Sequence, residues 1–126
     1  MNFVSVVMGW MLAASATHPI ACDLSALTPD QRTRHEALGQ RLKSAIVSTE
    51  ELSNGFRFTL SPELSIVEAA TWVDLERRCC PFLEFTIGLG RKSGPVWVQL
   101  TGSRETKAFV REAIVPARRS SRKGGK

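Results

Sequence analysis

A chain of 126 residues that is 43% hydrophobic and 23% charged has the composition of one globular domain with tails. Its net charge of +5 comes from the last ten residues, which hold five basic side chains, and without them 12 basic residues face 12 acidic ones. A neutral body argues against a nucleic-acid-binding face in the fold, and three cysteines make a poor disulfide framework.

Residues 1–18 are predicted to be an apolar extension, either a signal peptide or a misassigned start. The uncharged run from Phe3 to Ala16 is too short to span a bilayer as a helix. It has the length of a signal-peptide core and ends in Ala14-Ser15-Ala16, but no basic residue precedes it. We favour a cytoplasmic protein, exported if residues 1–16 are a signal peptide. In an oxidising compartment the thiols would tend toward disulfides.

Residues 19–116 are predicted to form a single α+β domain, whose first helix follows Cys22. A capping threonine, a first-turn proline and a capping-box glutamine mark its start: Thr28, Pro29 and Gln31. Its thin apolar stripe consists of Leu38 and Leu42. His35 lies beside this stripe, either as a metal ligand or, as we favour, as a partly exposed neighbour.

A β-hairpin is predicted next, over residues 46–52 and 56–60. Apolar and polar residues alternate along its second strand, as is typical of a half-buried strand. Asn54-Gly55 supplies the turn. A three-residue loop with a left-handed Gly55 would pair Leu52 with Phe56 and keep both side chains on the apolar face.

The second helix ends at the most distinctive stretch of the chain. A capping box marks its start, formed by Ser65 and Glu68. Pro81 disfavours helical geometry at Cys80, so the helix should end near Cys79. Glu76 falls inside the apolar arc of this helix. We favour an ion pair with an arginine of the sheet or first helix over a role beside the thiols.

A second hairpin, over residues 82–89 and 95–101, and a third helix complete the order αββαββα. Short connections favour antiparallel neighbours, which predicts a four-stranded antiparallel sheet with helices packed on one face. Trp97 and Phe82 are predicted on the other face. There, Trp97 would meet the first helix, the N-terminal segment or a second subunit of a homodimer.

Residues 117–126 are predicted to be a basic disordered tail. Such a tail would bind an acidic partner or nucleic acid weakly and in a salt-dependent way. Its basic residues are Arg118, Arg119, Arg122, Lys123 and Lys126.

The cysteines are the main functional signal. Three thiolates in trigonal geometry suit a soft ion such as Hg(II), As(III) or Cu(I), provided that Cys22 comes close to Cys79 and Cys80. Zinc fits less well, because it usually needs four ligands and would require a histidine or carboxylate as well. A bridge from Cys22 to one of the adjacent pair would leave the other free. The alternative is that all three residues pack as small hydrophobes.

Several motifs also match a known pattern. They are Cys22, Glu-x-x-Cys-Cys-Pro-Phe over residues 76–82, Gly-Pro-x-Trp-x-x-Leu-Thr-Gly over residues 94–102, and Lys-x-Phe over residues 107–109. In these motifs, residues 19 to about 115 resemble a family of small, mostly uncharacterised bacterial proteins. The resemblance implies that the three cysteines belong to one site, and similar Cys-Cys-Pro-Phe segments occur in settings of soft-metal resistance.

The sequence therefore predicts a binding protein more than an enzyme. Cys22, Cys79 and Cys80 would hold a soft metal or metalloid ion, and Glu76 would assist as a neighbouring proton acceptor. No catalytic triad, phosphate loop or paired-carboxylate site is visible in the sequence. One alternative is a thiol redox protein, in which Cys79 or Cys80 is the nucleophile and Cys22 resolves it. The other is an interaction domain with structural cysteines.

Overall fold

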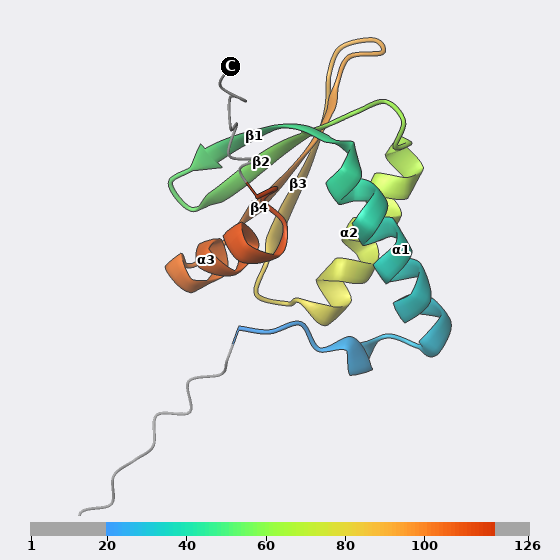
Figure 1. Cartoon of the computed structure of the whole chain (residues 1–126), viewed down its shortest axis with the longest axis vertical. Helices are drawn as coiled ribbons and strands as arrows, with labels where there is room; N and C mark the ends of the chain where they lie inside the picture. The colour runs from blue at the N-terminus through green and yellow to red at the C-terminus, as the bar shows by residue number, and fades with distance from the viewer. Residues whose placement is uncertain (1–19, 118–126) are drawn as a thin grey trace, which may run out of the picture.

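The computed structural model describes residues 20–117, which fold into three α-helices and one four-stranded antiparallel sheet (Figure 1). The elements are a short 3₁₀-helix η1 (Leu24–Ala26), α1 (Pro29–Ala45), β1 (Ile46–Leu52), β2 (Gly55–Leu60), α2 (Ile66–Cys79), β3 (Glu84–Leu89), β4 (Val96–Thr101) and α3 (Arg104–Ala113). The α+β class and the order αββαββα are confirmed. The predicted N-terminal extension, and the predicted tail beyond Ala117, lie outside the described residues.

The two long helices begin as the sequence predicts. Thr28 accepts a hydrogen bond from the backbone of Gln31, whose side chain accepts one in return, and Ser65 and Glu68 repeat this box at α2. Each box satisfies backbone N–H groups that a helix start leaves without partners. The helix α2 ends at Cys79, one residue before the position that Pro81 disfavours for helix.

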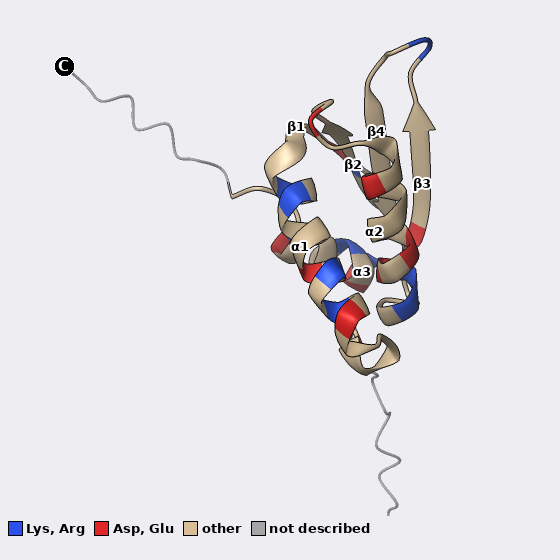
Figure 2. Cartoon of the chain, turned by 90° about the vertical axis from the view of Figure 1, so that its right-hand side faces the viewer, with Lys and Arg blue, Asp and Glu red and all other residues tan. Residues whose placement is uncertain are grey.

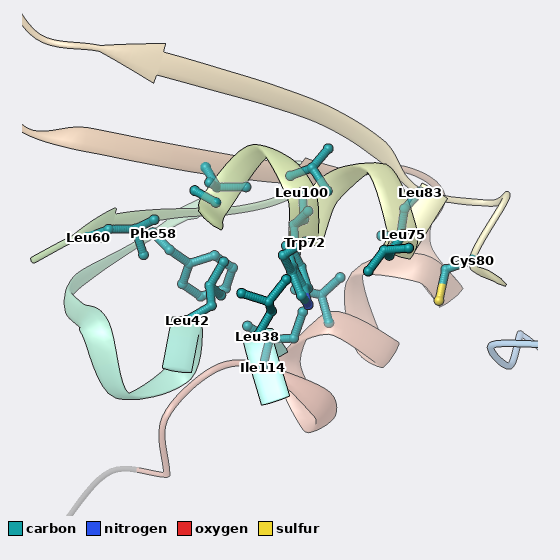
Figure 3. Close-up of a cluster of buried hydrophobic side chains, with 14 of the residues drawn as sticks. Leu38, Leu42, Phe58, Leu60, Trp72, Leu75, Cys80, Leu83, Leu100 and Ile114 are labelled. Atoms are coloured by element: carbon teal, nitrogen blue, oxygen red, sulfur yellow. The ribbon is translucent and has the colours of Figure 1, made fainter. Parts of the chain in front are cut away.

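The sheet has the strand order β1-β2-β4-β3, so β2 and β4 form its centre. Its buried face carries the alternating apolar residues of these two strands: Phe56, Phe58, Leu60, Val98 and Leu100. The helices cover this one face, as predicted. Figure 3 shows Leu38 and Leu42 of α1 and Trp72 and Leu75 of α2 in this core, with Cys80 toward one end of it.

The turn between β1 and β2 differs from the prediction. Leu52 pairs with Gly55, so Ser53 and Asn54 occupy the turn. None of the described glycines has a positive φ. A Cβ at Gly55 would instead collide with the carbonyl oxygen of Leu100 on β4. Glycine is required here for the close approach of two strands, not for a left-handed turn.

The opposite face of the sheet carries Trp97, which is half-buried. The guanidinium of Arg57 lies 4.3 Å from the centre of its ring, and any side chain at Gly88 would collide with the indole. Of the three predicted covers for this face, the first helix is excluded, because α1 packs on the other face. Cover by the N-terminal segment or by a second subunit stays a prediction. Phe82 is also absent from this face. It precedes β3, and its ring meets that of Phe109 edge-on, with centroids 5.2 Å apart.

Charge is distributed over the surface of the domain. Residues of both signs lie along α1, whereas the tip of the β3–β4 hairpin carries the basic residues Arg91 and Lys92 (Figure 2). Within residues 20–117, no helix combines the length and apolarity needed to cross a membrane.

Candidate metal centre

The adjacent cysteines lie at the C-terminal end of α2. Both are fully buried, and their sulfurs are 3.7 Å apart. Successive residues of a helix point about 100° away from each other. Cys80 has left helical geometry, at φ −123° and ψ 71°. This change of backbone direction, which Pro81 favours, accompanies the convergence of the two side chains.

Cys22 reaches this pair from the segment before α1. It forms a disulfide with Cys80, which leaves Cys79 as the free thiol. The backbone N–H of Asp23 donates to the carbonyl oxygen of Cys79 at 2.7 Å, so the chain beside Cys22 is tied to the end of α2. The three sulfurs lie within 4.8 Å of one another.

Glu76 lies beside the cysteines and is almost completely buried. Its Oε1 is 3.3 Å from the sulfur of Cys80 and 3.9 Å from that of Cys22. Disulfide sulfurs carry no proton, so these contacts become hydrogen bonds only on reduction. Its Oε2 accepts a hydrogen bond from Nε2 of His35. The predicted arginine partner of Glu76 is therefore wrong, because the partner on the first helix is a histidine.

His35 is the site residue whose place the sequence reasoning underestimated. It is half-buried, and its Nε2 is 3.8 Å from the sulfur of Cys79. His35, Glu76 and Cys79 form a second cluster in which one ligand atom of each residue lies within 4.8 Å of the others. The available signal was spacing, since His35 precedes Leu38 and Leu42 by one and two helical turns and shares their buried face.

The free thiol is held in its neutral form. Burial of Cys79, followed by the nearby carboxylate of Glu76, raises the pKa of this thiol from 9.0 to about 11. Cys79 therefore has little thiolate near neutral pH, which makes it a poor nucleophile. A bound metal ion would reverse this preference, because coordination deprotonates a thiol.

A pocket of about 550 Å³ lies between the helices and reaches part of the cluster. Cys22, His35 and Glu76 border it. Its apolar lining includes residues of η1, α1, α2 and α3 and the residue after α3: Leu24, Leu42, Trp72, Phe109, Ala113 and Ile114. A molecule entering this pocket would meet Cys22 of the disulfide, the imidazole and the carboxylate.

Comparison of the chain with protein-family models, with curated proteins and with solved structures found no match. The family resemblance therefore stays a prediction. The structure itself contains a disulfide, an adjacent buried thiol and two residue clusters with the spacing of metal ligands. Cys22, Cys79, Cys80 and Glu76, which the sequence assigned to one site, do lie together.

Proposed function

We propose that the reduced protein binds one soft metal or metalloid ion through Cys22, Cys79 and Cys80. The meeting of three sulfurs from segments 58 residues apart carries this proposal. Sulfurs bonded to one trigonal ion at about 2.3 Å lie about 4 Å from each other. The 3.7 Å between Cys79 and Cys80 is close to this spacing. Three thiolates suit Hg(II), As(III) or Cu(I), whereas zinc usually takes a fourth ligand.

Reduction must come first. Two electrons and two protons from a small thiol reductant convert the Cys22–Cys80 disulfide into two thiols. The sulfurs then separate from a bond of about 2 Å to about 4 Å. Cys22 lies in a stretch without helix or strand and borders the pocket, so a reductant has access to its sulfur. Ion binding then releases the thiol protons, and Glu76 is close enough to accept one from Cys22 or Cys80.

The test is an anaerobic titration of the reduced full chain with Hg(II) in the presence of excess monothiol competitor. We expect saturation at one ion per chain, with a sulfur-to-metal charge-transfer band. The C79S/C80S variant should lose both the saturation at one ion per chain and the charge-transfer band. The oxidised wild type is the matched control. It is titrated without the monothiol, which would reduce its disulfide, and it should lack the charge-transfer band of the trithiolate site. Unchanged stoichiometry in C79S/C80S would contradict the proposal.

The disulfide itself favours a second candidate function, thiol–disulfide exchange. Here Cys80 would be the nucleophile and Cys22 the resolving residue, because the raised pKa of Cys79 makes it unsuited to attack. Equilibration in glutathione buffers separates this function from a structural bridge. A potential below about −300 mV would mark the bridge as structural.

The remaining expectations concern partners and compartment. Capture of an acidic partner or nucleic acid by the basic tail, homodimer formation and a cytoplasmic location stay predictions. The compartment decides which form of the site is present. Reducing conditions favour three thiols and thus soft-ion binding, whereas oxidising conditions favour the disulfide beside one thiol.

A further inference from the structure

A second set of donor atoms lies beside the disulfide. Glu76 and Cys79 are three residues apart on α2, so they share one face of that helix. His35 faces them from α1, in contact with Glu76 and with its Nε2 3.8 Å from the Cys79 sulfur. Residues at i and i+3 of one helix, met by a ligand from a facing helix, also build metal sites in helical bundles.

We propose that the oxidised protein binds one divalent cation of intermediate softness, Zn(II) being the best match, through His35, Glu76 and Cys79. One imidazole nitrogen, one carboxylate oxygen and one thiolate are all ordinary zinc ligands. A soft ion would prefer more sulfur. This site differs from the trithiolate site in oxidation state and in the class of ion, and Cys79 is the one ligand that the two proposed sites have in common.

The geometry is close to what the ion needs. Ligand atoms about 2.0–2.3 Å from a tetrahedral ion lie roughly 3.3–3.8 Å from each other. The distance of 3.8 Å from Cys79 to His35 lies at the upper limit of this range. Glu76 and His35 are already in contact, and the ion would replace the proton between them as the side chains move slightly apart. On binding, Cys79 releases its thiol proton, and the Nε2 proton of His35 moves to Nδ1 or to solvent.

The fourth position of this ion is open. Cys22 and Cys80 are the nearest additional sulfurs, but they are bonded to each other and are not available as thiolates. His35 and Glu76 border the pocket of about 550 Å³, which leaves room for water or a small ligand on the ion. Three protein ligands with one exchangeable position are the arrangement of catalytic rather than structural zinc sites.

The test uses the oxidised full chain and Co(II), a spectroscopic substitute for Zn(II). We expect one Co(II) per chain, tetrahedral visible bands and an ultraviolet thiolate-to-cobalt band, all abolished by an equivalent of Zn(II). C79S should lose the ultraviolet band, and H35Q should weaken binding at least tenfold. H35Q keeps a side-chain amide that can donate to Glu76, so the fold should survive. E36Q is the matched control, because Glu36 lines the same pocket outside the donor set, and it should bind as wild type does.

Two outcomes would overturn this site: no thiolate-to-cobalt band in the wild type, or equal affinity in folded H35Q. The soft-ion proposal fails separately. A C22S/C80S variant lacks the trithiolate set but should still bind Co(II) through the mixed set. Reduced H35Q should still bind Hg(II).

Discussion

At the scale of single residues, Cys79 links the two proposed binding modes. It is fully buried, does not take part in the disulfide, and lies within 4 Å of the sulfur of Cys80 and Nε2 of His35. The helix end and the carboxylate of Glu76 both oppose a negative charge on this sulfur. A positive ion at either site would remove that penalty.

The raised pKa of Cys79 predicts how the oxidised protein reacts with iodoacetamide. Because only the thiolate reacts, alkylation should be slow at pH 8 and should accelerate about tenfold per pH unit up to about 11. Mass spectrometry of quenched samples gives the rate, and C79S is the control for labelling elsewhere. A rate that levels off near pH 9 would contradict the burial argument.

The same pKa shift has a consequence for stability. The unfolded chain, with a thiol pKa near 9.0, loses this proton before the folded one does. The free energy of unfolding is therefore higher below pH 9, where the thiol is neutral in both states, than at pH values above the pKa of the folded state. That advantage declines as pH rises from about 9 to about 11.

At the scale of elements, α2 positions the centre and α1 completes it. The ends of both helices were predictable, because caps and Pro81 act on their immediate neighbours. The contact between His35 and Glu76 was not predictable in this way. The residues next to each one in the sequence do not determine which side chains of two packed helices meet. The β1–β2 turn was mispredicted for a related reason. Glycine is needed at position 55 because β4 packs against it, and β4 lies more than 40 residues away in the sequence.

Removal of the α2 cap should destabilise the domain. In S65A, the backbone N–H of Glu68 loses its acceptor, which should lower the free energy of unfolding by about 1 kcal/mol. Urea denaturation followed by tryptophan fluorescence measures the change. S44A is the matched control, since Ser44 is an exposed residue within α1 and not a cap. A loss in S44A equal to that in S65A would contradict the capping argument.

At the scale of the whole molecule, the disulfide connects residues 58 apart and encloses α1, β1, β2 and α2 in one loop. Periodicity and short connections predicted these elements and the one-sided sheet that β1 and β2 form with β3 and β4, two strands that follow the loop. They could not predict the bridge, because the proximity of Cys22 to Cys80 depends on how all four elements pack. The sequence alone identified the cysteines but not which two are bonded.

Reduction of this bridge should lower the stability of the domain. Closing a loop of this length lowers the entropy of the unfolded chain by an amount worth up to about 4 kcal/mol. Urea denaturation with and without reductant should show this loss, and C22S should reproduce it. C79S is the control, because it keeps the bridge and should still respond to reductant. Equal stability of the oxidised and reduced wild type would exclude a stabilising bridge.

The hydrogen bond from Asp23 to the carbonyl oxygen of Cys79 matters most once the bridge is open. Together with Leu27, which is buried in the core, it holds both the residue after Cys22 and the start of α1 in place. A tethered group of this kind has an effective concentration of about a millimolar or more. An ion caught first by Cys79 and Cys80 would therefore gain its third sulfur by chelation within one molecule. Cys22 would then affect the rate at which the ion dissociates more than the rate at which it binds.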